Sequence, residues 1–294
     1  MSKPASKETV VEVVELPTLV AYTPRERARA FVRAAFPKRK WKVVTVRDVS
    51  EFRAMLRKTL VDAALVDVAS PSAIASAGVD SSSTSQLSAA SGTDDTWKIA
   101  AIAQEFPSVP FFGITPLRAT DAPAVARCAA MEFCDILADG LDDAVAKDIV
   151  GPRTFTARFT AALADPPQSL GLKSEMQLAT WKSILASAGR PVRTASLAKE
   201  VGVSREHLSR HFSTPGAPNL KRVIDLVRMI GAAELAKNSG LDVRDVARIL
   251  GFASSSHLAV TAQRVLGTRP ASLSRLRTVD LIERFTQGRT RSRG

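Results

Sequence analysis

The chain has 294 residues, of which 45% are hydrophobic and 24% are charged. These values are typical of globular proteins, so they exclude wholesale disorder and allow one large domain or two ordinary ones. The longest apolar runs, such as residues 63–68, are much shorter than the ~18–20 residues that cross a bilayer. Residues 1–17 alternate charge with valine and lack the apolar stretch and cleavage site of a secretory signal. We therefore expect a cytoplasmic location and no membrane partner.

The positive charge is concentrated in the last part of the chain. Residues 171–294 contain 21 Lys and Arg against 9 Asp and Glu, which accounts for the whole net charge of +12. A concentrated positive field attracts polyanions, because binding releases counterions condensed on a phosphate backbone. Solvated helix faces and an anionic membrane surface are alternative explanations of the same charge.

Cysteine and histidine are too few and too scattered for a metal site. Cys128 and Cys134 lie in one short segment, whereas the histidines (His207, His211 and His257) all lie in the last third. A structural zinc site needs about four clustered ligands. We therefore expect no metal, a reducing compartment and two ordinary buried thiols.

The first half alternates short apolar runs with segments of helical spacing. Strands are predicted over residues 16–22, 41–46, 63–68, 109–114 and 134–137. Helices are predicted over residues 25–36, 50–60 (with Ser50 as N-cap), 97–106, 122–130 and 143–163. This alternation is typical of a parallel sheet covered on both faces. We predict a doubly wound α/β domain.

Residues 62–71 (DAALVDVASP) resemble the third strand of response-regulator receiver domains. In receivers an aspartate ends this strand and a proline follows four residues later, and Asp67 and Pro71 have those places here. Residues 109–115 (VPFFGIT) are similar to the fourth receiver strand, which ends in Ser or Thr, here Thr115. The resemblance covers residues 16–162 and implies that Asp67 and Thr115 lie at the carboxyl edge of the sheet, where such folds place ligands.

Two departures from the receiver pattern bear on function. Receivers hold Mg²⁺ with an acidic pair after the first strand, where this chain has Ala21-Tyr22-Thr23. They also use a lysine after the fifth strand, whereas residues 135–140 (DILADG) contain none. Phosphoryl transfer to a carboxylate depends on cations that neutralise the phosphoryl oxygens. We therefore predict a pseudo-receiver for dimerisation or for docking a regulatory protein. The alternative is a phosphorylation-switched response regulator with Asp67 as phosphoacceptor.

Residues 197–212 (LAKEVGVSREHLSRHF) have the pattern of a helix-turn-helix. Ala198 is small enough for two helices to cross closely, and Gly202 permits the positive φ of a tight turn. Ser204 can cap the second helix, which presents polar residues away from the core. Two ordinary packed helices are the alternative interpretation of this segment alone.

The same pattern recurs at residues 246–258 (VARILGFASSSHL), where Ala247 and Gly251 have the same spacing and the turn is one residue longer. Asp242 is a good N-cap for a helix over residues 243–250. Between the two copies, Asn219 can cap a connecting helix that continues through Lys237. Two such units joined by one helix are much more specific than either alone.

This arrangement resembles the AraC/XylS family of transcription regulators over roughly residues 174–276. The resemblance implies two helix-turn-helix subdomains on one rigid linker helix. It also implies that both recognition helices enter successive major grooves on one face of the DNA.

Carried over position by position, the resemblance assigns DNA-contacting positions in both units. They are Ser204, Arg205, Glu206, Ser209 and Arg210 in the first unit, and Ser255, Ser256, His257, Gln263 and Arg264 in the second. Arg210 is favoured for a guanine contact, since a guanidinium can donate to O6 and N7 together; a phosphate contact or a solvated arginine is the alternative. Glu206 can accept from cytosine N4 or form a surface ion pair. Val260, where the family often has a long polar side chain, and the short serines predict that the second unit contributes more backbone positioning than base readout.

The chain thus divides into five predicted segments. These are a flexible terminus (1–15), a receiver-like domain (16–163) with a Ser-rich loop (71–96), a linker (164–173), a double helix-turn-helix domain (174–280) and a basic tail (281–294). No Ser elbow or phosphate-binding glycine loop is present in the sequence, so we predict no catalytic residue and no cofactor. We predict a sequence-specific transcription regulator that is not an enzyme and that binds double-stranded DNA as a homodimer.

Overall fold

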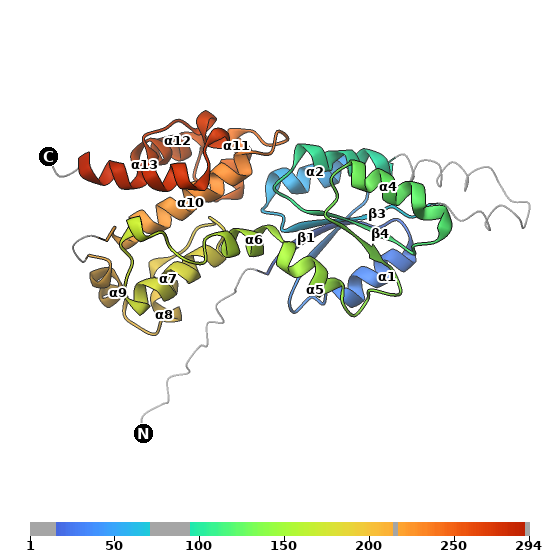
Figure 1. Ribbon diagram of the computed structural model, residues 1–294, viewed down its shortest axis with the longest axis horizontal. Helices are drawn as coiled ribbons and strands as arrows, with labels where there is room; N and C mark the ends of the chain where they lie inside the picture. The colour runs from blue at the N-terminus through green and yellow to red at the C-terminus, as the bar shows by residue number, and fades with distance from the viewer. Residues whose placement is uncertain (1–15, 71–94, 214–216, 292–294) are drawn as a thin grey trace, which may run out of the picture.

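The computed structural model describes residues 16–70, 95–213 and 217–291. Figure 1 shows an α/β half and an all-helical half side by side. This confirms the predicted fold class. The predicted terminus 1–15 and nearly all of the Ser-rich loop lie outside the described residues. Among the helices that the structure describes, none combines the length and apolar character needed to cross a membrane.

Five parallel strands form the sheet of the α/β half. They are β1 (Thr18–Tyr22), β2 (Lys42–Val46), β3 (Ala63–Asp67), β4 (Phe111–Thr115) and β5 (Asp135–Ala138). Their order is β2-β1-β3-β4-β5, and β1 pairs with β3 in a register that places Leu19 beside Ala63. All five predicted strands are confirmed, with ends shifted by one or two residues. The order reverses between β1 and β3, where doubly wound folds open a crevice at the carboxyl edge of the sheet.

Helices cover both faces of this sheet (Figure 1). α1 (Glu26–Ala35) and α5 (Ala146–Val150) lie on one face, and α2 (Val49–Lys58), a helix over 95–101 and α4 (Ala122–Ala130) lie on the other; the 3₁₀ turns are η2 (Ile102–Glu105) and η3 (Ala119–Asp121). Alternate residues of β1 join different cores, since Leu19 and Ala21 pack with Phe31 of α1, whereas Val20 and Tyr22 pack on the α2 side. Burial on both faces explains why these strands are continuous apolar runs.

Two local predictions in this half are wrong. Ser50 does not cap α2, because Asp48 is the N-cap and accepts a hydrogen bond from a first-turn backbone N–H at 2.9 Å. The single helix predicted over 143–163 is instead α5, the 3₁₀ turn η4 (Gly151–Arg153) and α6 (Phe155–Ala162). Pro152 lacks the N–H that a continuous helix needs, and Thr154 caps the new helix through its hydroxyl.

The helical half is built around one long central helix, α10 (Leu220–Ala236). The others are η5 (Gln168–Leu170), α7 (Glu175–Ala186), α8 (Thr194–Glu200), α9 (Arg205–His211), α11 (Val243–Ile249), α12 (Ser255–Leu266), η6 (Pro270–Arg275) and α13 (Thr278–Arg291). Asn219 caps α10 as predicted, and Lys237 ends it. Twelve of its seventeen residues are buried. The predicted connecting helix is therefore confirmed as the core of this half.

Two segments predicted to lie outside the helical domain belong to its core. α6 packs against α7 through Phe155 and Phe159, and the indole N–H of Trp181 donates to the Leu163 carbonyl at 2.8 Å. The tail predicted from residue 281 begins as the packed helix α13, in which Phe285 is fully buried. The helical spacing of apolar residues in α13 explains why it docks on α10 and α12.

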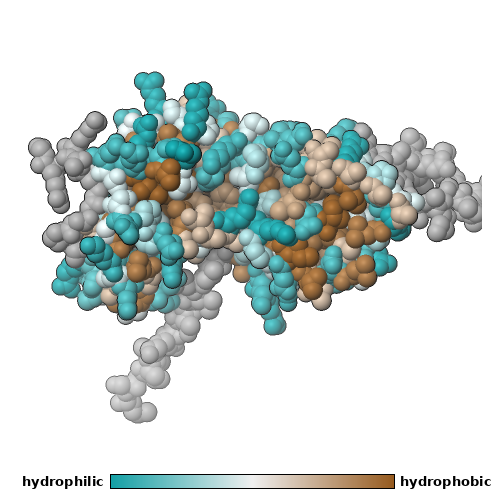
Figure 2. Space-filling model, in the orientation of Figure 1, coloured by the Kyte–Doolittle hydropathy of each residue, from teal (hydrophilic) through white to brown (hydrophobic). Residues whose placement is uncertain are grey.

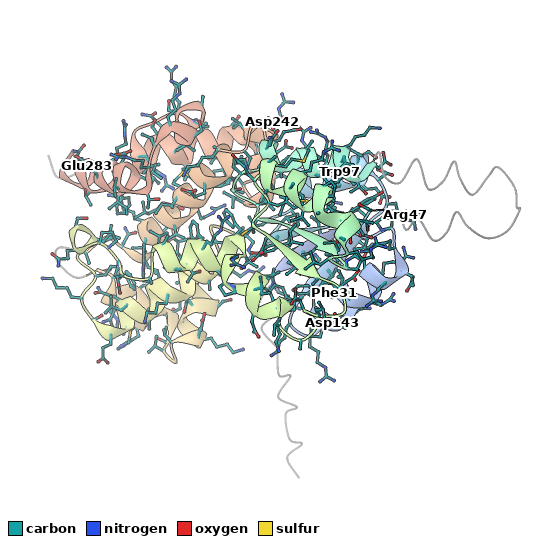
Figure 3. All side chains as sticks on the ribbon, turned by 45° about the vertical axis from the view of Figure 1, so that its right-hand side comes forward. Phe31, Arg47, Trp97, Asp143, Asp242 and Glu283 are labelled. Carbon is teal, nitrogen blue, oxygen red and sulfur yellow. The ribbon has the colours of Figure 1, made fainter. Side chains whose placement is uncertain are left out.

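The two halves are joined by direct contacts as well as by the chain. Arg57 at the end of α2 lies 2.7 Å from Asp245 in α11, whose carboxylate is almost completely buried. Buried Asn238, just after α10, exchanges hydrogen bonds with the backbone N–H and hydroxyl of Ser108. Figure 3 shows Asp242 at the start of α11 beside the α/β half. The second helix-turn-helix unit is thus held directly on the α/β half.

Candidate nucleic-acid interface

The two turns of the helical half have the same hydrogen bonds. In the first, Gly202 has φ +74° and the N–H of Val203 donates to the Ala198 carbonyl at 2.9 Å. In the second, Gly251 has φ +61° and the next N–H donates to the Ala247 carbonyl at 2.8 Å. This pattern is a Schellman motif, which needs a left-handed residue after the last helical turn. The predicted repeat is therefore a repeat of backbone geometry as well as of sequence.

The second helix of each unit starts at a serine cap. Ser204 accepts from the His207 N–H at 3.1 Å, and Ser254 accepts from the His257 N–H at 3.1 Å. The first cap confirms the prediction for Ser204. The second cap lies three residues after its glycine instead of two, which agrees with the longer turn seen in the sequence.

The predicted contact residues of α9 all point outward. Ser204, Arg205, Glu206, Ser209 and Arg210 are exposed, while Leu208 and Phe212 are fully buried. Among the described residues, no hydrogen bond or ion pair holds the side chain of Arg205, Glu206 or Arg210, so the surface ion pair considered for Glu206 does not form there. This face of α9 is available to a partner.

The predicted contact residues of α12 are more mixed. Ser256, His257 and Gln263 are exposed, but Ser255 is only half-exposed. Val260 leaves an exposed apolar side chain in the middle of this face, with 64% of its surface accessible. The exposed polar side chains on α12 are thus short or sparse.

Arg264 is tied to the central helix. Its Nη2 lies 2.7 Å from Asp225 of α10, a carboxylate that is 9% exposed. A second arginine acts in a similar way, because the Arg228 guanidinium of α10 lies 3.9 Å from the Phe252 ring centre and donates to the Leu250 carbonyl at 3.0 Å. Burial lowers the pKa of Arg228. These contacts fix the second unit on α10, and they were not anticipated from the sequence.

The carboxyl edge of the sheet carries a second cluster of polar residues, far from the helical half (Figure 1). Asp67 ends β3 as predicted, and its side chain is 1% exposed. Arg25 binds it through Nε at 2.8 Å and also binds Asp139, just after β5, through Nη2 at 2.8 Å. Burial raises the pKa of Asp67, and hydrogen bonds and charge from Arg25 oppose that rise. The guanidinium thus bridges two buried carboxylates.

Thr115 lies at this edge next to a second arginine–aspartate pair. Asp121 is fully buried and accepts hydrogen bonds from Arg118 and from the backbone N–H of Ser70 at 2.9 Å. Burial alone would raise the pKa of Asp121, but these hydrogen bonds and one from Thr115 lower it well below its ordinary value. Among the described residues, no group of three metal-ligating side chains is present.

Sequence reasoning missed Arg25 and Asp139, although the strand pattern contained the information. Arg25 follows β1 by three residues, and Asp139 directly follows β5. The carboxyl ends of parallel strands share one edge of the sheet. The strand pattern therefore predicts that both side chains lie at the same edge as Asp67. Compared with the receiver pattern, an arginine stands near the acidic pair's place and an aspartate near the lysine's.

Comparison with known proteins finds the helix-turn-helix pattern independently. Residues 197–275 match the family model described as "Helix-turn-helix domain". The chain is 28% identical over 123 residues to the HTH-type transcriptional regulator GlxA of Rhizobium meliloti (strain 1021), covering 39% of this chain and 38% of that protein. The match thus spans about two fifths of that relative's length.

One solved structure is also similar. The crystal structure of full-length FixJ from B. japonicum aligns over 84% of this chain and 96% of its own, with 12% identity and a TM-score of 0.31. The family match over residues 197–275 includes both repeated turns, at Gly202 and at Gly251. This match agrees with the helix-turn-helix patterns that the sequence predicts.

Proposed function

We propose that the protein is a sequence-specific transcription regulator whose α9 and α12 enter successive major grooves of double-stranded DNA. The observation that carries this proposal is the repeated unit described above: two Schellman turns, each followed by a serine-capped helix, on one buried connecting helix. Because α10 is continuous and packed on most sides, it sets a fixed spacing between the two recognition helices, α9 and α12. The regulator acts by binding and has no enzymatic activity of its own.

The two units have different roles in this proposal. α9 reads bases, because the side chains of Arg205, Glu206, Ser209 and Arg210 are exposed and have no competing protein partner among the described residues. α12 mainly positions the backbone through Ser255, Ser256, His257 and Gln263. Arg264 shares its guanidinium with Asp225, so it orients the unit and contacts phosphate with its remaining donors.

The α/β half acts as a pseudo-receiver. Arg25 supports this role, because its guanidinium covers the carboxylate of Asp67 at the place where a phosphoryl donor would have to approach. We propose that this half mediates homodimerisation or contacts a regulatory protein. Sedimentation equilibrium of the full chain tests the dimer, and a monomer at all concentrations would leave partner docking as its role.

Phosphorylation of Asp67 is the competing hypothesis. Incubation with acetyl phosphate and Mg²⁺, followed by intact mass, is expected to show no added phosphoryl group. An increase of one phosphoryl mass that disappears in Asp67→Asn would overturn the pseudo-receiver assignment and leave the DNA-binding proposal intact.

Substitution of Arg210 tests the groove assignment. Arg210→Ala is expected to weaken binding to a preferred operator by about 1–3 kcal/mol and to relax discrimination at one base pair. Lys182→Ala is the control, because Lys182 is an exposed cation on α7 of the same half. Equal operator affinities for wild type and Arg210→Ala at moderate salt would contradict the placement of α9 in the major groove.

A further inference from the structure

A cavity of about 690 Å³ lies between the two halves, at the amino edge of the sheet. This is the edge opposite Asp67. Its walls on the α/β side come from the starts of β1 and β2 and the end of α2, and those on the helical side come from the α7–α8 connection and the second turn. The lining residues that matter below are Lys38, Trp41, Lys42, Lys58, Arg190 and Arg248. The volume lies within the range of small-molecule sites in proteins.

Among the described residues, the charged side chains that line this cavity are all cations. Arg190 and Arg248 are partly engaged, since Arg190 donates to the Ser187 carbonyl at 2.9 Å and Arg248 lies 3.0 Å from Asp245. The side-chain ammonium groups of Lys38, Lys42 and Lys58 have no hydrogen bond or ion pair within the part of the chain that the structure describes. Five positive charges around one cavity repel one another, and an anion with several charges would relieve that repulsion.

The cavity also offers a flat apolar surface. Trp41 is half-buried, and its ring is held edge-on against Phe36 with ring centres 5.4 Å apart. Apolar lining from Val43, Pro191 and Ile249 lies in the same cavity. An indole fixed in this way is a platform on which an aromatic ring can stack. The site therefore combines a ring surface with a multiply charged anion site.

We propose that this cavity binds a nucleotide, with its base against Trp41 and its phosphates among Lys38, Lys42 and Lys58. A nucleoside polyphosphate joins a flat ring to three or more negative charges, which matches the three lysine side chains that lack a partner among the described residues. A simple aromatic carboxylate supplies one charge and leaves most of the repulsion unrelieved. This inference goes beyond the proposed function, because the binding needs no DNA. Since Gly251 lines the cavity, the ligand would touch the turn that precedes α12.

Calorimetric titration of the full chain with ATP, without added metal, tests the proposal. Lys42→Glu and Lys58→Glu are each expected to weaken ATP binding at least tenfold. Lys40→Glu is the matched control, because Lys40 is exposed two residues from Lys42, does not line the cavity and changes the net charge equally. Trp41→Leu is expected to weaken ATP binding while leaving inorganic triphosphate binding unchanged.

Several results would overturn the proposal. One is no heat of ATP binding at millimolar concentration, and another is an equal loss in Lys40→Glu, which would show only diffuse attraction. Inorganic triphosphate that binds as tightly as ATP would exclude a ring site. If Lys42→Glu and Lys58→Glu weakened duplex DNA binding and left ATP binding unchanged, the lysines would be phosphate-backbone contacts. Circular dichroism checks that each variant is folded.

Discussion

Arg25 binds the carboxylate of Asp67 through two side-chain nitrogens. Its Nε lies 2.8 Å from Oδ1 and 3.0 Å from Oδ2 of Asp67, and its Nη2 lies 2.7 Å from Oδ1. The backbone N–H of Arg25 adds a further hydrogen bond to the same carboxylate at 3.2 Å. A planar guanidinium suits this two-point contact better than an ammonium does. One residue thus supplies both the side-chain and the main-chain donors for a buried carboxylate.

Removal of this guanidinium is expected to destabilise the α/β half. Arg25→Ala leaves Asp67 and Asp139 buried without their main cation, and breaking a fully buried pair costs about 3–5 kcal/mol. Because the Arg25 side chain is 31% exposed, water screens part of the charge, and we expect a loss of about 2–3 kcal/mol. Urea unfolding at neutral pH measures it.

Arg33→Ala is the matched control for this experiment. Arg33 lies on α1 in an exposed ion pair with Glu26, so its loss should leave the stability nearly unchanged. Equal midpoints for Arg25→Ala and wild type would mean that the bridge contributes nothing.

The stability of the same edge is expected to depend on pH through Asp121. Its folded-state pKa lies below its ordinary value, so its carboxylate stabilises the fold above the unfolded-state pKa of about 3.9. That stability is lost as pH falls below about 4. The Asp121→Asn variant should lack this part of the decrease in stability at low pH.

Unfolding free energies measured from pH 6 down to pH 2 test this prediction. The wild type should lose more stability than Asp121→Asn over that range. Asp280→Asn is the control, because Asp280 has a lowered pKa at a more exposed site in α13. Parallel pH curves for wild type and Asp121→Asn would contradict the assignment.

The two thiols should differ in reactivity. The prediction of two buried thiols was wrong, because Cys128 is buried and Cys134 is exposed. Burial raises the pKa of Cys128 to about 11, and only a thiolate reacts. At pH 8 iodoacetamide should label Cys134 alone in the native protein. Mass spectrometry after a short exposure should show one label, and two after denaturation; two native labels would mean that Cys128 is accessible.

Gly231 sets how closely α10 approaches the α7–α8 connection. A Cβ at this position would lie 3.0 Å from the Ala188 carbonyl oxygen and 3.2 Å from the Gly189 Cα, both backbone atoms. Gly231→Ala should therefore destabilise by about 1–3 kcal/mol, as overpacking does. Thermal unfolding detects the loss.

Gly288→Ala provides the comparison, since Gly288 lies in α13 with no atom within 4 Å of an added Cβ. Alanine there should gain up to about 1 kcal/mol of helix propensity. A gain in stability from alanine at both positions would show that the helix at Gly231 has room for a Cβ atom, contrary to the prediction.

Much of the fold was predictable because its signals are local. The five strands follow from short apolar runs, and the two turns follow from Ala198 with Gly202 and Ala247 with Gly251. Caps were predictable only where one candidate stood alone: Ser204 and Asn219 were right, but Ser50 was displaced by Asp48, which reaches the first turn better.

What the sequence could not provide were contacts between residues distant along the chain. The Arg25–Asp139 pair joins residues 114 apart, and Arg57 reaches Asp245 across 188 residues. The same holds for the contact of Trp181 with the Leu163 carbonyl and for the burial of Phe285 in the segment predicted as a tail, since both depend on how the helices pack. Figure 2 shows hydrophilic side chains along much of the outline of the helical half, with hydrophobic patches between them.

The docking of α6 on α7 decides where the chain can be cut. A fragment starting at residue 171 would strip Phe155 and Phe159 from the helical core and remove the carbonyl that receives the Trp181 indole. Such a fragment would expose apolar surface that the intact chain buries, and we expect it to aggregate. A soluble fragment that contains both recognition helices should therefore begin at Thr154, which lies inside the segment predicted from the sequence as the receiver-like domain.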